Sequence, residues 1–377
     1  MKASRVRAMA RKEFIHIFRD PRSLGMGIAI PMIMLILFGY ALTLDVDKVP
    51  MVIWDQNRSQ ASREFISHFL GSRYFALQAY VDHYNDVEKA IDSRRALTAL
   101  IIPSDFADRL AAGKITKIQL IVDGSDSNTA TIASGYAEVI TANYSQDLVL
   151  QNFQKKAGLL AASPLELRPR VWFNADLESR NYIIPGLIAV IMMVIAALMT
   201  SLTVAKEWEQ GTMEQLISTP VKAPELIIGK LIPYFAIGLF DVLLAVLMGE
   251  FLFHVPLRGH VALIFAQAAI FLIGTLSLGM LISITTKNQL LASQLAMVAT
   301  FLPAFLLSGF AYPIRSMPKV LQWITYLVPA KYFVILLKGI YLKGVGPGVL
   351  YVEGLFLAVF GLLMFVLANK KFKKKLV

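Results

Sequence analysis

The fold is decided at residues 182–220, which read YIIPGLIAVIMMVIAALMTSLTVAKEWEQGTMEQLISTP. The first 23 of these residues, Tyr182–Val204, contain no charged side chain. As a helix they are long enough to cross a bilayer, whose hydrocarbon core is ~30 Å thick. A segment with charged residues, 205–220, follows directly and ends at Pro220. The arrangement predicts a membrane span that continues into water and ends in a short structure of its own.

Other apolar segments of similar length predict an α-helical integral membrane protein with six spans. A hydrophobic content of 56% and a mean hydropathy of +0.59 exclude an ordinary soluble protein. We expect the first segment to be a retained span rather than a cleaved leader, because it is too long and lacks a small-residue cleavage site. The six predicted spans are Leu24–Leu44, Tyr182–Val204, Leu231–Phe253, Val261–Ile284, Leu290–Phe310 and Val349–Asn369.

The charge distribution predicts the topology. The net charge is +11, but residues 45–181 hold 15 Lys/Arg against 17 Asp/Glu, so the surplus lies elsewhere, mainly at the two ends and around the spans. This is typical of a membrane protein and argues against a nucleic-acid partner. Basic flanks stay in the cytoplasm, so both termini are predicted inside and residues 45–181 outside. One outer stretch, residues 311–348, departs from this rule with Arg315, Lys319, Lys331, Lys338 and Lys343.

Residues 1–23 are predicted to form a cytoplasmic amphipathic helix in the headgroup plane before the first span, 24–44. A solvated basic tail is the alternative. The apolar stripe predicted for residues 4–19 consists of Val6, Ala10, Phe14, Ile17 and Phe18.

Residues 45–181 are predicted to form an extracytoplasmic α/β domain between the first and second spans. Short apolar runs alternate there with helical patterns, the last being a long helix over about 128–156 and a strand at 168–173. The chain has no cysteine, no HExxH and no GxSxG, and its carboxylates are scattered. We therefore expect no catalytic residue and no metal site.

The charged segment after Val204 contains its own start and stop signals. Gly211 suits the end of the preceding helix, and Thr212 with Gln215 resembles a capping box. Pro220 ends the new helix, which is predicted over Met213–Ser218.

This helix is too short to persist without packing. Its apolar face is Met213, Leu216 and Ile217. That face either packs on the protein's own spans or fills a groove in a cytoplasmic partner.

The sequence here resembles the type-2 ATP-binding-cassette (ABC) exporter permeases, between their second and third spans. Residues 11–24, 181–188 and 307–344 are similar to other segments of that family, so the resemblance covers nearly the whole chain. Ala175 departs from the proline expected there and affects only a local turn. One span, a large outer domain and five more spans resemble the drug-exporter-like branch. The matching signature residues are Glu207, Gly211, Thr212, Glu214, Leu216, Thr219, Pro220, Glu225, Gly229 and Lys230.

The resemblance implies a mechanism. Two six-span permease subunits, identical or paralogous, form the pathway, and ABC ATPase subunits bind below and hold ATP and magnesium. It also implies a five-span domain at 182–377 with a cytoplasmic coupling helix in 205–230 and an outer re-entrant segment at 311–348. The chain contains no GxxxxGK[ST], so the energy is expected from a separate polypeptide, and the chain itself binds no cofactor. The implied ATPase-coupling residues are Glu207, Gly211, Thr212, Met213, Glu214, Leu216, Ile217, Thr219 and Pro220.

Asp241 is the candidate substrate-pathway residue, about ten residues and roughly 15 Å into the third predicted span. A charge at that depth is costly, so it handles a cation or proton, or it pairs within the bundle.

Two functions follow. The first is an exporter permease in the bacterial inner membrane that moves a hydrophobic or amphipathic substrate, with a periplasmic adaptor protein and membrane lipid as further partners. The second is a membrane-anchored sensor or scaffold whose outer domain binds a ligand or envelope partner. Six spans favour the permease.

Overall fold

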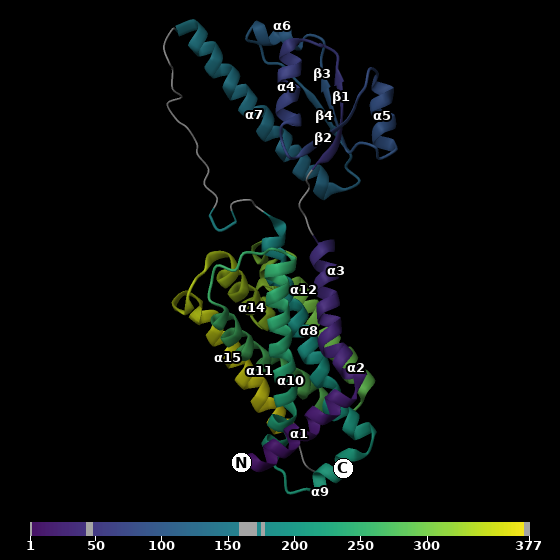
Figure 1. Cartoon of the computed structure of the whole chain (residues 1–377), viewed down its shortest axis with the longest axis vertical. Helices are drawn as coiled ribbons and strands as arrows, with labels where there is room; N and C mark the ends of the chain where they lie inside the picture. Colours follow the sequence, from purple (N-terminus) through teal and green to yellow (C-terminus); the bar gives the residue numbers. More distant parts are fainter. Residues whose placement is uncertain (1, 43–47, 158–171, 175–177, 373–377) are drawn as a thin grey trace. The chain divides into compact units, whose positions relative to one another are not determined.

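The structure is a computed structural model that describes residues 2–42, 48–157, 172–174 and 178–372. The chain divides into two compact units (Figure 1). A helical unit combines residues 1–44 with 170–377, and a smaller unit comprises residues 45–169.

The helical unit begins with α1 (Ala3–Arg19), α2 (Pro21–Leu24), the π-helix η1 (Gly25–Ala29) and α3 (Ile30–Ala41). After the smaller unit follow α8 (Ser179–Glu209), α9 (Thr212–Ser218), α10 (Ala223–Leu247), η2 (Met248–Leu252), α11 (Val261–Thr286) and α12 (Gln289–Leu307). The last elements are η3 (Ile314–Ser316), α13 (Lys319–Thr325), α14 (Pro329–Lys338), the π-helix η4 (Gly339–Lys343) and α15 (Pro347–Lys371).

Five helical segments among the described residues are long and apolar enough to cross a membrane: α8, α10 with η2, α11, α12 and α15. They match the second to sixth predicted spans. A pair bent by 81°, α13 with α14 and η4, raises the number to six if it is counted as one span. The first predicted span corresponds to a shorter apolar helix, Gly25–Ala41, and its end at residues 43–44 lies outside the described residues.

α8 is the centre of the helical unit and is almost entirely buried within the chain. It packs against α3, α10, α11, α12 and α14. α8 and α11 approach closely at Gly279, which has no Cβ. A Cβ added there would lie 2.2 Å from the carbonyl oxygen of Ala197. Small residues allow this kind of backbone approach between membrane helices. Because α8 is buried on every face, its sequence is apolar on every face.

One end of the bundle gathers segments that are far apart in the sequence. Met9 of α1, Met213 of α9, Ile284 of α11 and Phe372, just after α15, belong to one apolar cluster. Figure 1 shows α1 and α9 at this end of the unit, with the far end of α3 opposite. The described beginning and end of the chain therefore lie on the same side of the bundle.

The smaller unit is a four-stranded mixed sheet covered by helices on both faces (Figure 1). The strand order is β2-β1-β3-β4, with β1 parallel to β2 and β3, and β3 antiparallel to β4. Its elements are β1 (Val49–Asp55), α4 (Gln60–Leu70), β2 (Phe75–Tyr80), α5 (Tyr84–Asp92), β3 (Thr98–Ile102), α6 (Phe106–Ala111), β4 (Gln119–Val122) and α7 (Ser127–Ala157).

The alternation of side chains along β1 gives this unit two cores. Met51 and Ile53 point to the face covered by α4, α6 and α7, whereas Val52 points to the face covered by α5. The predicted α/β alternation is present in the described residues. The last predicted strand, 168–173, lies mostly outside them.

Candidate functional site

Residues 205–230 connect α8 to α10 through the short helix α9. α8 ends at Glu209, and Gly211 follows with φ +70°, the left-handed region that favours glycine. α9 ends at Ser218, and Thr219 is extended before Pro220, as expected of a residue that precedes proline. The stop signals in the sequence therefore predicted both helix ends correctly.

The predicted capping box is wrong. Gly211 is the N-cap of α9, and Thr212 is already its first helical residue. The Thr212 hydroxyl donates instead to the carbonyl oxygen of Glu207, at 3.4 Å. The cause is the left-handed turn at Gly211, which redirects the chain one residue earlier than the capping pattern requires.

The apolar face of α9 packs on the protein's own helices. Met213 and Leu216 are buried and Ile217 is partly buried. Their cluster includes Val204 of α8, Ile227 of α10, Met280 of α11 and Met9 of α1. The sequence left two alternatives for this face, and the structure shows the first, packing on the chain's own helices rather than in a groove of a partner.

The polar face of α9 is exposed. It consists of Glu214, Gln215 and Ser218, with Gly211 before the helix and Pro220 after it. A partner can therefore reach these groups without disturbing the apolar packing behind them.

α1 lies directly against α10 at Gly229. A Cβ on Gly229 would lie 2.5 Å from the Cβ of Met9 and 3.2 Å from the carbonyl oxygen of Val6, so only glycine permits this approach. The buried face of α1 is Met9, Ala10, Glu13 and Ile17. Phe18, which the predicted stripe included, is 66% exposed and lies outside this packed face, and its contact with the membrane surface stays a prediction.

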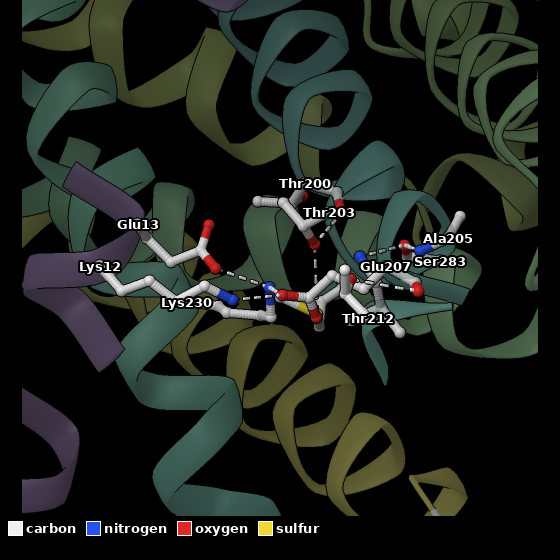
Figure 2. A network of polar contacts seen from close by, with 11 residues as sticks. Lys12, Glu13, Thr200, Thr203, Ala205, Glu207, Thr212, Lys230 and Ser283 are labelled. Carbon is white, nitrogen blue, oxygen red and sulfur yellow. Dashed lines mark hydrogen bonds and ion pairs between the residues drawn. The ribbon is translucent and has the colours of Figure 1, made fainter. Parts of the chain in front are cut away.

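A cluster of four charges joins α1, α8 and α10 (Figure 2). The Lys230 amine lies 2.7 Å from Glu13 Oε1 and 2.9 Å from Glu207 Oε1, and its side chain is 1% exposed. Lys12 Nζ lies 3.0 Å from Glu207 Oε1. Figure 2 shows these four side chains pointing toward one another. Two cations meet two anions, which offsets the cost of burying Lys230, Glu13 and Glu207. The Lys12 side chain is 50% exposed.

A second contact fixes α1 nearer its N-terminus. Glu225, 1% exposed, accepts hydrogen bonds from the backbone N–H groups of Lys2 at 2.7 Å and Lys222 at 3.0 Å. Arg5 lies 3.5 Å from the same carboxylate and donates to the carbonyl oxygen of Pro220 at 2.6 Å. α1 is thereby attached to the residue that ends α9.

The C-terminal end of α8 is also bonded to α11. Ser283 Oγ accepts from the backbone N–H groups of Val204 at 3.0 Å and Ala205 at 2.9 Å. Thr203 Oγ1 lies 3.7 Å from the sulfur of Met280. These contacts, drawn in part in Figure 2, place the helix end that carries Glu207.

A cavity of about 940 Å³ lies beside this cluster. Most of its lining residues come from α1, α8, α9 and α10, with Met26 of η1 and Gln289 of α12. Glu207 Oε2 is buried and has no hydrogen-bond partner among the described residues. Those residues contain no group of three or more His, Asp or Glu side chains that could hold a metal ion. The cavity is lined by, among others, Lys12, Glu13, Lys206, Glu207, Gln215 and Lys230.

Asp241 lies in α10 and is 2% exposed. Its Oδ1 atom has no hydrogen-bond partner, and no ion pair to it is present, within the described part of the chain. Its place in a substrate pathway stays a prediction.

The contacts that α1 contributes to the site were not predicted from the sequence. Glu13 was not predicted to be buried, although it falls four residues from both Met9 and Ile17, on the same helical stripe. A carboxylate on an apolar stripe was the signal. Its partner Lys230 is 217 residues away, a separation over which no local pattern connects two residues.

Comparison with known proteins gives matches over nearly the whole chain. A family model described as ABC-2 family transporter protein matches residues 21–370. The probable multidrug ABC transporter permease YbhS of Escherichia coli strain K12 is 39% identical over 374 residues, covering 99% of this chain and 97% of YbhS. The probable multidrug ABC transporter permease YbhR of the same strain is 32% identical over 342 residues, 90% of each chain. The inner membrane transport permease YhhJ of Escherichia coli strain K12 is 25% identical over 358 residues, covering 91% of this chain and 92% of YhhJ.

Proposed function

The chain belongs to the ABC-2 family of transporter proteins, and from this premise we propose that it is the permease subunit of an ABC exporter. Family membership confirms the resemblance seen in the signature after Tyr182. The chain is a transport permease subunit rather than an enzyme. In the proposal it moves a hydrophobic or amphipathic substrate, drug-like or lipid-like, outward. ATP is hydrolysed by a separate ATPase subunit, which holds the nucleotide and magnesium.

The exposed polar face of α9 carries the proposal. A helix of seven residues does not persist alone, but this one is held by the buried Met213 and Leu216. It therefore presents Glu214 and Ser218 from a fixed position. The proposed docking surface for the ATPase is this polar face, in place of the apolar face expected from the sequence.

In the proposal, the charge cluster transmits a movement of α9 to the helices that it connects. Displacement of α9 acts on α8 through the short turn at Gly211. It acts on α1 through Arg5, which holds Pro220. Lys230 then links α1, α8 and α10 in one network. In the proposed cycle, closure of the ATPase moves these three helices together.

The partners follow from the family. Membership implies an ABC ATPase and a second permease subunit, identical or paralogous. We extend the proposal to a periplasmic adaptor and to membrane lipid. The described beginning and end of the chain lie on one side of the bundle with α9, which we assign to the cytoplasm on the positive-inside rule. The smaller unit is then periplasmic, and the location is the inner membrane, the word used in the name of YhhJ.

Asp241 is assigned to proton or cation handling along the pathway. The support is a buried carboxylate for which the described residues offer no ion pair. An ionisable side chain inside a bundle commonly marks such a pathway.

Charge reversal on α9 tests the docking surface. Glu214 is exposed, so Glu214→Lys leaves the permease folded and its free energy of unfolding within about 1 kcal/mol of wild type. We expect the variant to lose its ATPase on co-purification and to lose transport-coupled ATP hydrolysis. Glu138→Lys, an exposed charge reversal on α7, is the matched control and keeps both.

If Glu214→Lys retains the ATPase and full activity, α9 is only a packed connection. That result would favour the alternative function, a membrane-anchored sensor or scaffold. Five long apolar helices among the described residues are nevertheless more than a membrane anchor requires.

A further inference from the structure

The second half of the chain contains a long stretch without acidic residues. Between Glu250 and Glu353 there are seven Lys/Arg and no Asp or Glu. Lys287 lies at the α9 end of the bundle, where its amine stacks 4.4 Å from the ring centroid of Trp208. The other six are Arg258, Arg315, Lys319, Lys331, Lys338 and Lys343.

Two of these lysines are packed into the helical unit under aromatic rings. Lys331 is 8% exposed; its amine donates to Thr325 Oγ1 at 2.9 Å and lies 3.5 Å from the ring centroid of Tyr326. Lys338 Nζ lies 3.1 Å from the ring centroid of Tyr182. Within the described residues neither amine has a carboxylate within ion-pair distance.

Two ring stacks place Lys331 deep in the bundle. The neighbouring Phe333 stacks on Phe271 with centroids 4.2 Å apart, and Tyr332 stacks on Phe356 at 4.9 Å. Phe271 and Phe356 are ten and nine residues from the starts of α11 and α15. At ~1.5 Å per residue, both stacks lie roughly 15 Å inside the ends of these helices.

The lysines form a row from that depth toward the end of the bundle. Lys331 and Lys338 are seven residues apart, which on an α-helix means about 20° in direction and about 10 Å in rise. Lys343 follows at the end of η4, next to Gly344, whose added Cβ would lie 3.1 Å from the carbonyl oxygen of Arg258.

The row lacks the anions that such cations need. A buried ammonium without a counter-charge is costly, and a tyrosine ring offsets only part of that cost. A phosphate oxygen would supply a charge-assisted hydrogen bond to each amine. Beside the row, α13 and the turn after it present an apolar surface: Val320 and Trp323 of the helix and Leu327 of the turn are each more than 70% exposed. That surface suits an acyl chain.

We propose that Lys331 and Lys338 bind the phosphate head of an anionic phospholipid whose acyl chains lie along α13. The site deepens the proposed function by naming an anionic amphiphile as the substrate class. Only the statement that this lipid is cargo rests on the proposed function; binding itself does not.

Lipid binding by the purified full chain tests the site. The probes are acyl-labelled phosphatidylglycerol and phosphatidylcholine, titrated in a neutral detergent. We expect a preference for phosphatidylglycerol. Lys331→Met or Lys338→Met, which keep the length of the side chain, should each lower the affinity for phosphatidylglycerol by about tenfold and leave phosphatidylcholine unchanged. Lys331→Arg and Lys338→Arg should retain most of the preference. Lys287→Met is the matched control, a lysine over an aromatic ring at the other end of the bundle, and should bind as wild type.

Equal binding of both lipids by the wild type would overturn the proposal, as would unchanged phosphatidylglycerol affinity in both methionine variants. If a methionine variant fails to fold, the wild-type preference and its loss at high salt decide the question.

A second arm separates cargo from a resident lipid. In vesicles that contain the permease with its ATPase, movement of labelled phosphatidylglycerol between leaflets on addition of ATP identifies cargo. Binding without movement identifies a resident lipid and leaves the site intact. Absence of any ATP-driven transport would count against the proposed function and not against the site.

Discussion

At the scale of single residues, Lys230 has the largest predicted effect on stability. It is the cation shared by Glu13 and Glu207, and its side chain is 1% exposed. Lys230→Met leaves two buried carboxylates with less compensation, which costs about 3–5 kcal/mol for a broken buried pair. We expect thermal unfolding in detergent to report this loss.

The control for Lys230 is Lys12, which bonds the same Glu207 from a side chain that is 50% exposed. Lys12→Met should cost less than about 1 kcal/mol, because solvent screens an exposed pair. Equal losses of stability in Lys230→Met and Lys12→Met would mean that the charge cluster is more hydrated than its burial indicates.

Gly229 is the second residue with a sharp prediction. Gly229→Ala places a methyl group 2.5 Å from Met9 Cβ, so α1 must move away from α10. Overpacking of this kind costs about 1–3 kcal/mol. Limited proteolysis should then cut within α1 more readily than in wild type. Gly25→Ala meets nothing within 4 Å and should leave the cleavage pattern unchanged.

The signature residues Glu225, Gly229 and Lys230 were recognised from the sequence, but their contacts were not. All three act on α1, through Lys2, Met9 and Glu13 respectively. These contacts arise from tertiary packing across more than 200 residues, which helical periodicity does not encode.

At the scale of elements, the structure changes the expectation for Leu216. If the apolar face of α9 filled a groove in a partner, which was one alternative from the sequence, Leu216→Asp would fold normally and lose only the ATPase. Leu216 is buried against the chain's own helices, so the substitution places a charge in an apolar cluster and should lower stability by several kcal/mol. We expect a reduced yield of folded permease on gel filtration as well as loss of the ATPase. Folded, stable Leu216→Asp would mean that α9 leaves this cluster easily.

The bounds of α9 could be predicted because glycine and proline act locally. Its orientation could not, since an apolar face of three residues fits a groove in a partner as well as a cluster in the same chain. The long spans were predicted for the opposite reason: an uninterrupted apolar run suits only a helix surrounded by lipid or by other helices.

At the scale of the whole molecule, cysteine labelling tests the topology. The chain has no cysteine, so each single substitution gives an unambiguous signal. In intact spheroplasts, Ser125→Cys should react with a membrane-impermeant maleimide and Ser218→Cys should not. Both positions are exposed, so the difference reports the side of the membrane and not burial. The reverse result would overturn the assignment of α9 to the cytoplasm.

The burial of α8 has a consequence for biosynthesis. Its neighbours α10, α11, α12 and α14 all follow it in the chain, and roughly 130 residues separate the end of α8 from the end of α14. At roughly 5–20 residues per second, α8 waits about 6–26 s in the lipid before the last of them is made. A polar face would be costly during that interval. The segment Tyr182–Val204 has no charged group, so it can stay in the membrane until the later helices close around it.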